Sequence, residues 1–407
     1  MQLLYAFLVL LPLVPGFRAD YPGRCSCESP NSVQCYRLTG VPPGIPPTTT
    51  RLYISHSKIQ HLQLSNLTAV LALEDFILLA SGTESVGSDT FKTLSTLKTL
   101  ELWKNKLRQV PRAPPASLDV LKLNENAIGT LRGSDFKGLK RLRVLELQNN
   151  LICSLPARAL APLVSLESLA VDSNNIRVHS WVPDLKHLEN LSHLYLSGNC
   201  ISSIEGVQLL ANLTTLEVSQ NQLQALPLRL PARLQKLDCS GNLIGRVTVQ
   251  DFQDFQDVRD LRHLFLDNNN VSLFEAGALQ WCVQLSNLAL EQNLLGNAIQ
   301  DMAEQKLRGL KQLQVLNLRN NKISALELRA LKGLPWLRGT DVRGGRCAAP
   351  AEHKGESWMW SRTIVQQCQP LLRPGAAGPS THKGEDKEVD EDTAGLAEEE
   401  DEDYEVE

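Results

Sequence analysis

Residues 97–107 have the sequence Leu-Lys-Thr-Leu-Glu-Leu-Trp-Lys-Asn-Lys-Leu, and this stretch decides the fold of the chain. Its pattern is L-x-x-L-x-L-x-x-N-x-L, which returns clearly at residues 142–152 and 313–323. Asparagine occupies the same position of the pattern at Asn105, Asn126, Asn150, Asn174, Asn199, Asn221, Asn242, Asn269, Asn293 and Asn321. Successive asparagines are 21 to 28 residues apart, so the chain is built from one repeated unit.

A repeat of this period and pattern predicts a leucine-rich repeat solenoid. In each L-x-L segment the leucines point to one side of a short strand and the intervening residue points to the other. Stacked coils bury the leucine row together, which no single coil can do alone. The predicted fold is therefore an α/β solenoid, a curved horseshoe with a parallel concave β-sheet. The asparagine amide, both a donor and an acceptor, would satisfy backbone groups where each coil turns inward.

The repeat extends beyond the ten asparagines. Ser57 and Ser81 lie on the same 24-residue grid as two degenerate early repeats, and Gly345 continues the phase at the other end. We expect about 12 to 13 repeats over residues 51–345. Phe91, Phe136, Leu160 and Phe252 would pack on short helical turns of the return segments.

The two ends suggest an extracellular route. Residues 1–19 resemble a signal peptide, with an apolar run from Leu3 to Val14 that is too short to span a membrane. We expect cleavage after Ala19, with Gly16 as the alternative. No later stretch approaches 18 apolar residues, so the sequence predicts a secreted chain without a membrane span.

Cysteines flank the repeats on both sides. An oxidising compartment favours disulfides, and open solenoid ends need caps. We expect an N-terminal cap over residues 20–50, with one bridge among Cys25, Cys27 and Cys35, and a C-terminal cap over residues 346–370, closed by Cys347 and Cys368. Cys239 occupies a leucine position and should be an inert buried thiol.

Residues 371–407 form a predicted disordered acidic tail, since from Arg373 onward 14 acids face 3 bases. The tail either keeps the chain soluble or captures a basic partner. Tyr404, embedded among acids, is a candidate for tyrosine sulfation. Four sequons are candidates for N-glycosylation: Asn66, Asn190, Asn212 and Asn270.

The sequence offers no site for chemistry. It lacks the common phosphate-loop, dinucleotide, zinc-protease and nucleophile-elbow motifs. His187, Glu189 and His193 are close in sequence, but the first histidine falls on a turn and the last on a strand, so scattered surface residues are the better interpretation. We predict a non-enzyme with no catalytic residues, no metal and no cofactor, and no binding of nucleic acid.

The outward strand positions should form a ligand-binding face on the concave side. Acids outnumber bases there, and exposed aromatic anchors among charges are typical of protein interfaces. The candidates are Glu101, Trp103, Glu146, Tyr195, Glu217, Asp238, Phe265 and Asp267. A basic or mixed-charge protein ligand suits this face better than an acidic glycan does.

The signal peptide, the cluster Cys25-Ser-Cys27…Cys35, about a dozen repeats and the two-cysteine end together resemble the small leucine-rich repeat proteoglycan family. The resemblance implies an extracellular matrix protein that binds collagens and growth factors. It also implies a Cys25–Cys35 bridge. The family's first cysteine is replaced by Tyr21 here, which leaves Cys27 without its partner. Attachment of a glycosaminoglycan normally needs a Ser-Gly pair in a mobile acidic stretch. The pairs Ser81-Gly82, Ser197-Gly198 and Ser240-Gly241 all lie inside coils, so we expect a glycoprotein and not a proteoglycan.

Three functions follow from these observations. The leading expectation is a secreted matrix glycoprotein that sequesters a growth factor and inhibits transforming growth factor-beta signalling, which the resemblance implies. The alternatives are a collagen-fibril-binding structural matrix protein and a soluble receptor-like recognition module. The ligand that the concave face binds would distinguish them.

Overall fold

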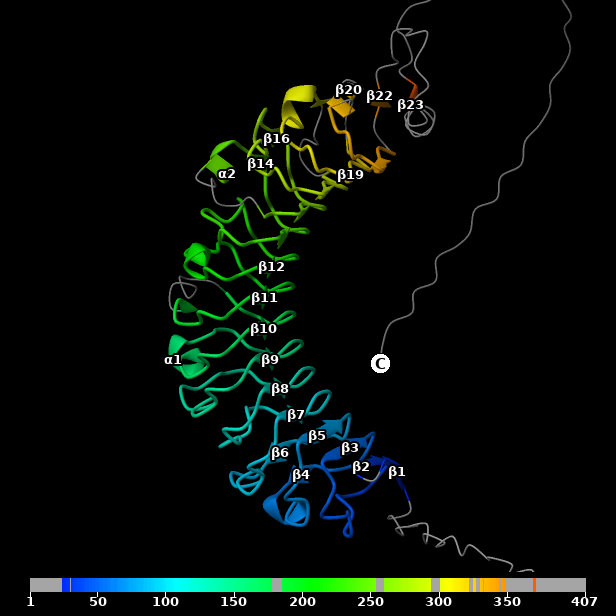
Figure 1. Ribbon diagram of the computed structural model, residues 1–407, viewed down its shortest axis with the longest axis vertical. Coiled ribbons are helices and arrows are strands. Elements are labelled where there is room, and N and C mark those ends of the chain that lie inside the picture. Colours follow the sequence, from blue (N-terminus) through cyan, green and yellow to red (C-terminus); the bar gives the residue numbers. More distant parts are fainter. Residues whose placement is uncertain are drawn as a thin grey trace, which may run out of the picture. The chain divides into compact units, whose positions relative to one another are not determined.

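A computed structural model describes residues 24–370, apart from residues 30, 178–184, 254–259, 294–300, 322–324, 327–329, 332, 344–345 and 348–368. The predicted signal peptide and acidic tail therefore lie outside the described residues. Within the solenoid, successive coils follow one another in chain order, with the large sheet on the inner side and α1 and α2 on the outer side (Figure 1). The predicted solenoid with its parallel inner sheet is confirmed.

The main sheet has 15 strands. β1 pairs antiparallel with β2, and every later pair in the sheet is parallel. In order the strands are β1 (Cys25–Ser29), β2 (Ser32–Tyr36), β3 (Arg51–Ser55), β5 (Asp75–Leu79), β7 (Thr99–Glu101), β8 (Val120–Lys122), β9 (Val144–Glu146), β10 (Ser168–Ala170), β11 (His193–Tyr195), β12 (Thr215–Glu217), β13 (Lys236–Asp238), β15 (His263–Phe265), β17 (Asn287–Ala289), β19 (Val315–Asn317) and β21 (Gly339–Asp341).

The strand register stacks leucine on leucine. Leu100 pairs with Leu121, which pairs with Leu145 on the next strand. Each of these side chains is fully or almost fully buried. Because every coil contributes to the same inward row, the core is one continuous cluster that runs along the solenoid, and each coil depends on its neighbours for burial.

The asparagine ladder makes the hydrogen bonds that the sequence predicts. Asn150 accepts a hydrogen bond from the Ile128 amide at 3.0 Å, and its own amide donates to the carbonyls of Leu123 and Leu147, each at 3.0 Å. One side chain therefore connects its own coil to the preceding one. Burial of this polar group is tolerable because its donor and acceptor are both used.

Serine replaces asparagine in the first two repeats and makes some of the same hydrogen bonds. Ser81 Oγ accepts from the Ser57 amide at 3.3 Å, and Ser57 Oγ accepts from the Leu38 amide at 3.0 Å. Each hydroxyl also donates to a carbonyl two residues earlier. The grid therefore continues into the N-terminal coils with a smaller side chain.

The residue that precedes each ladder position has a left-handed backbone conformation. Glycine meets this requirement without strain at Gly198 and Gly241, where φ is +66° and +65°. Elsewhere other residues adopt it, namely His56, Ala80, Lys104, Glu125, Asn149, Ser173, Gln220, Asn268, Gln292 and Asn320. The repeated hydrogen bonds of the following asparagine or serine hold the backbone in this turn.

The return segments carry short, varied elements. These are the paired strands β4 (His61–Leu62) and β6 (Ser85–Val86), β14 (Arg246–Val247) and β16 (Leu273–Phe274), β18 (Asp301–Met302) and β20 (Ala325–Leu326), and β22 (Arg346–Cys347) and β23 (Gln369–Pro370), with helices α1 (Ala157–Leu160) and α2 (Gln250–Gln253) and 3₁₀ turns η1 (Leu64–Asn66), η3 (Val207–Leu209) and η4 (Glu304–Lys306). The predicted packing residues Phe91, Phe136, Leu160 and Phe252 are buried.

The N-terminal end is closed by the β1–β2 hairpin. A disulfide joins Cys25 to Cys35, and Cys35 is fully buried against the first coil. Cys27 is half-buried and forms no disulfide; its thiol lies 2.6 Å from the Ser29 carbonyl oxygen. At the other end Cys368 and the Cys347 side chain lie outside the described residues, so the Cys347–Cys368 bridge stays a prediction.

The cysteines inside the coils are not disulfide-bonded. Cys239 and Cys282 are buried, and burial raises the pKa of both thiols, that of Cys282 to about 12. A neutral, buried thiol behaves as a small apolar side chain, as expected for Cys239. Cys153 is exposed and Cys200 is half-buried. Among the residues that the structure describes, no helix is long and apolar enough to cross a membrane.

Candidate ligand-binding face

The strand register fixes which outward side chains are neighbours on the inner face. The middle row contains the predicted residues Glu101, Glu146, Tyr195, Glu217, Asp238 and Phe265, and it also contains Ile77, which was not among the predicted residues. Trp103 and Asp267 lie in the next row, two residues further along their coils. Two alanines interrupt this row. Ala170 and Ala289 are 3% and 6% exposed, so their side chains project little from the sheet at both places. They delimit a central stretch that spans β11, β12, β13 and β15.

We call this stretch the central patch and define it by three rows of four residues. The middle row is Tyr195, Glu217, Asp238 and Phe265; the row before it is His193, Thr215, Lys236 and His263; the row after it is Ser197, Ser219, Ser240 and Asp267. Backbone hydrogen bonds between coils keep the third row in step, for example from the Gly198 amide to the Ser219 carbonyl at 2.9 Å. The patch therefore belongs to four consecutive, rigidly coupled coils.

The structure divides the predicted face into two parts. Glu101 and Glu146 lie on β7 and β9, on the other side of Ala170 from the central patch. Both carboxylates approach the ammonium of Lys122, at 3.3 Å and 3.8 Å. One ammonium thus offsets half of the charge of the two carboxylates in this part of the face, and Trp103 lies beside it. Only Tyr195, Glu217, Asp238, Phe265 and Asp267 of the predicted residues are brought together.

Lys236 is a residue of the central patch that the sequence analysis missed. Its Nζ atom lies 2.6 Å from Glu217 Oε1 and 5.6 Å from the centre of the Phe265 ring, which gives an ion pair and a cation–π contact. Burial disfavours its charge, but the hydrogen bond and charge of Glu217 outweigh burial and raise the pKa of the ammonium. Lys236 has the same strand position as His193 and His263, so the repeat phase could have identified it.

The aromatic residues of the face, Trp103, Tyr195 and Phe265, were expected to be exposed but are half-buried. Neighbouring rings explain the two in the patch. His193 lies roughly parallel to Tyr195 and His263 to Phe265, with ring centres 6.3 Å apart in each pair. Each aromatic ring thus has a parallel ring beside it on its own strand, and the Phe265 ring also contacts the Lys236 ammonium.

Three aspartates on or beside the patch have no cationic partner within ion-pair distance among the described residues. Asp172 Oδ1 accepts from the Ser197 amide at 2.7 Å, Asp238 Oδ1 from the Ser240 amide at 3.0 Å, and Asp267 Oδ1 from the Glu291 amide at 2.6 Å. Each carboxylate is thereby fixed in place but keeps its charge uncompensated. A basic group on a ligand would meet preorganised acceptors here.

Two of these carboxyls are unusual in their acidity. Burial raises the pKa of Asp172 to about 6 against the opposing hydrogen bond from Ser197, and nearby Glu217 adds to the rise. Burial likewise raises the pKa of Asp267 to about 6, with Glu291 and Asp238 as further contributors. Both groups are mostly ionised at neutral pH and would lose charge in a mildly acidic environment.

The predicted sequons lie away from the middle row. Asn190 and Asn212 occupy the same position on adjacent coils, and their amides donate to the carbonyls of Val164 at 3.0 Å and Glu189 at 2.7 Å. Asn66 accepts from the Gln63 amide at 2.8 Å. Their glycosylation, that of Asn270 and the sulfation of Tyr404 stay predictions, and Tyr404 lies outside the described residues.

The repeated coils and their parallel inner sheet define a leucine-rich repeat protein. The leucine-rich repeat family profile matches residues 116–176 and 296–339. The chain is 54% identical to mouse nephrocan over 94% of this chain and 95% of that protein. It is 28% identical to mouse podocan, over 76% of this chain and 54% of podocan, and 28% identical to human lumican, over 66% and 93%. This chain belongs to the small leucine-rich repeat proteoglycan family, a group of extracellular matrix proteins.

Solved structures agree on the fold. A leucine-rich repeat protein of Leptospira interrogans superposes with a TM-score of 0.58 at 22% identity, covering 80% of this chain and 73% of its own. A structure described as a TLR13–ssRNA13 complex gives the same TM-score and identity, covering 74% of this chain and 47% of its own. At these identities the likeness shows the solenoid alone.

Proposed function

We propose that this chain is a secreted glycoprotein that sequesters a growth factor on its central patch and thereby inhibits transforming growth factor-beta signalling. The observation that carries the binding part is the combination of two fixed aromatic rings with three uncompensated aspartates on five consecutive coils, from β10 to β15. Aromatic anchors supply apolar contact area, and the carboxylates select a basic ligand surface. The choice of growth factor rests on the family resemblance and on the likeness to nephrocan.

The patch is suited to sequestration because it is rigid and needs little reorganisation. The aspartates are held by backbone amides, and Lys236 is held by Glu217 and Phe265. A preorganised surface loses less conformational entropy on binding than a flexible one does. A growth factor bound there would be unavailable to its receptor, and the signal would fall without any chemical reaction.

The test uses the full-length secreted protein and immobilised transforming growth factor-beta, together with a cell reporter of its signalling. The patch variant Tyr195→Ala/Asp238→Asn/Phe265→Ala should lose both binding and inhibition. The control Trp103→Ala/Glu101→Gln/Glu146→Gln alters the part of the same face on β7 and β9, outside the central patch, and should retain both. Absence of growth-factor binding by the wild-type chain, with co-sedimentation on collagen fibrils, would replace the proposal by the structural alternative.

A further inference from the structure

The solenoid carries a second charged surface on its outer coil segments, opposite in sign to the central patch. Six exposed bases occur between residues 105 and 160 whose side chains form no ion pair with any described acid: Arg108, Arg112, Arg132, Lys137, Lys140 and Arg158. By contrast, the inner-face bases Arg51, Lys122, Lys236, Arg319 and Arg343 each have a carboxylate partner. The charges of the outer bases are therefore not neutralised by ion pairs with described acids.

Three of these arginines belong to three consecutive coils, and the segments that carry them are adjacent. The Arg132 guanidinium donates to Gln109 Oε1 on the preceding coil at 3.0 Å, and Gln109 and Arg112 line the same pocket. On the other side, a Cβ atom built on Gly133 would lie 3.4 Å from the Cβ atom of Arg158. We call Arg112, Arg132 and Arg158 the basic stripe.

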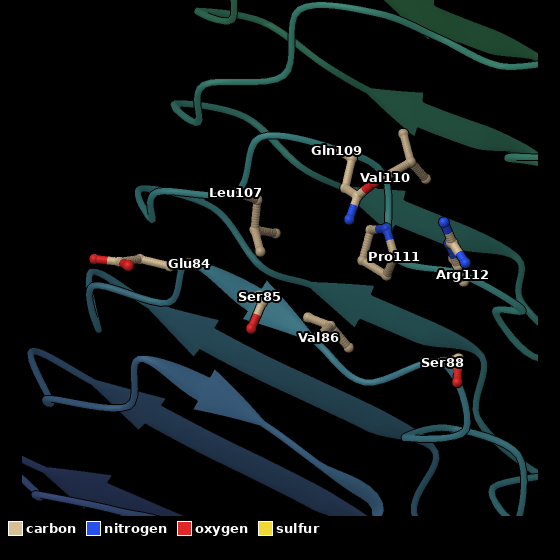
Figure 2. A pocket seen from close by; sticks show the side chains of 9 residues that line it. All are labelled: Glu84, Ser85, Val86, Ser88, Leu107, Gln109, Val110, Pro111 and Arg112. Atoms are coloured by element: carbon tan, nitrogen blue, oxygen red, sulfur yellow. The ribbon is translucent and has the colours of Figure 1, made fainter.

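A pocket of about 190 Å³ adjoins the basic stripe. Figure 2 shows it between β6 and the segment 107–112 of the next coil, with Ser88 and Arg112 at one end and Glu84 at the other. Its walls combine hydroxyl and amide groups, from Ser88 and Gln109, with apolar surface from Val86 and Pro111. Such a wall suits a sugar ring, which presents both hydroxyl groups and carbon–hydrogen faces.

Three acids on nearby segments, Glu84, Asp89 and Asp135, offset only part of the charge of the six outer bases. Glu84 approaches Lys106 at 3.8 Å, and Asp135 is buried with its carboxylate accepting from the Arg132 backbone amide at 2.7 Å. Asp89 is exposed but forms no ion pair with a described base. The guanidinium groups consequently keep most of their donors for an external anion.

We propose that the basic stripe and the adjoining pocket bind a sulfated polysaccharide. Guanidinium groups present paired donors that match the oxygens of a sulfate group. Their distribution over successive coils matches a linear polyanion with one charged group after another, which a single small anion would not need. Clusters of bases of this kind are typical of heparin-binding surfaces. The inner face and the outer stripe would then bind two different ligands.

The experiment measures binding of the full-length protein to heparin at physiological salt, and to hyaluronan, which carries carboxylates but no sulfates. The variant Arg112→Gln/Arg132→Gln/Arg158→Gln should bind heparin roughly tenfold or more weakly, since it loses three ionic contacts. The control Arg246→Gln/Arg308→Gln/Arg338→Gln removes the same charge from exposed positions elsewhere and should stay within about twofold of wild type. Thermal unfolding of both variants verifies that they fold.

Three results would overturn the inference. Equal weakening in both variants would mean that net charge alone attracts heparin. No difference between the stripe variant and wild type would mean that the stripe is not used, as when the acidic tail of the same chain covers it. Binding of hyaluronan as strongly as heparin would remove the requirement for sulfate.

Discussion

The Nζ atom of Lys236 on β13 lies 2.6 Å from the Oε1 atom of Glu217 on β12. This ion pair decides the charge pattern of the central patch, because it neutralises Glu217 and leaves Asp238, in the same row, without a cation. The patch therefore presents its negative charge toward Asp238 and Asp267 and not uniformly. A ligand's basic group should approach on that side.

Replacement of Lys236 by methionine should strengthen the electrostatic attraction between the patch and a basic ligand. The change removes one positive charge and leaves Glu217 available. Association with the growth factor should accelerate severalfold at low ionic strength, with a smaller effect at physiological salt. The pair is partly exposed, so the free energy of unfolding should change by less than about 1 kcal/mol. Stopped-flow association rates over a salt series measure the first effect, and urea unfolding measures the second.

The matched control is Lys98→Met. Lys98 Nζ forms a comparable ion pair with Glu74 Oε2 at 2.8 Å, but it lies beside β7, several coils from the patch. Both variants change the net charge equally. If Lys98→Met accelerated association as much as Lys236→Met, the charge of the whole chain would control the rate, and the patch would have no special role.

Binding to the central patch should weaken as the pH falls from 7.4 to 5.0. Asp172 and Asp267, each with a pKa of about 6, become mostly neutral over this range. Burial, Lys236 and Arg262 lower the pKa of His263, so it gains less positive charge over this range than an ordinary histidine would. Surface plasmon resonance should show faster dissociation of a basic ligand at pH 5.0. The variant Asp172→Asn/Asp267→Asn should show a flatter pH profile, and an unchanged profile would contradict the assignment.

The same carboxyls should affect the stability of the fold in the opposite direction. Their pKa is higher in the folded chain than the ordinary value of 3.8, so the folded state holds more protons between about pH 4 and pH 6. Stability contributed by these groups is therefore greatest below pH 4, decreases as the pH rises to about 6, and is level above that. Asp172→Asn should stabilise the chain by roughly 1 kcal/mol at pH 7.4, after allowance for solvent screening, and by nothing at pH 3.5. Urea unfolding at the two pH values tests this.

The fold was predictable from the sequence because the spacing of residues within each repeat defines the geometry of its coil. The L-x-L spacing fixes strand faces, and the ladder asparagines fix the turns, so even the serine repeats at Ser57 and Ser81 could be assigned. The left-handed residues before the ladder positions were not predictable. Side chains such as Lys104 and Gln220 give no local signal for positive φ, and the turn is imposed by hydrogen bonds between coils.

The site was predictable only in part. Repeat phase identified the middle row, but it does not measure how far a side chain rises from the sheet. The burial of Tyr195 beside His193, and the capture of Glu217 by Lys236, depend on contacts between neighbouring coils. The sequence shows that small residues occupy the middle row at Ala170 and Ala289. That these two alanines border the central patch could be seen only from the strand register.

Removal of one ladder asparagine should destabilise the solenoid far more than removal of its neighbour. Asn174 accepts from the Ile152 amide at 2.9 Å, and its amide donates to the carbonyls of Leu147, Val171 and Asp172. Asn174→Ala leaves several buried groups unpaired and should cost about 2 to 4 kcal/mol. Asn175 is exposed and its side chain makes no hydrogen bond with a described residue, so Asn175→Ala should cost less than about 0.5 kcal/mol. Equal losses in urea unfolding would argue against the ladder.

The N-terminal cap offers a test of how the solenoid end is protected. The Cys25–Cys35 bridge closes the β1–β2 hairpin, and β2 covers β3, the first repeat strand. Cys25→Ala/Cys35→Ala should lower the free energy of unfolding, because the bridge no longer constrains the unfolded chain. The loss should be about 3 kcal/mol and not larger, because the closed loop is short. Cys27 forms no disulfide, so Cys27→Ala is the matched control and should change stability by less than about 1 kcal/mol. Hydrogen exchange should show the loss concentrated in β1 to β3, because distant coils keep their own neighbours. A uniform loss across all coils would instead mean that the solenoid unfolds as one unit.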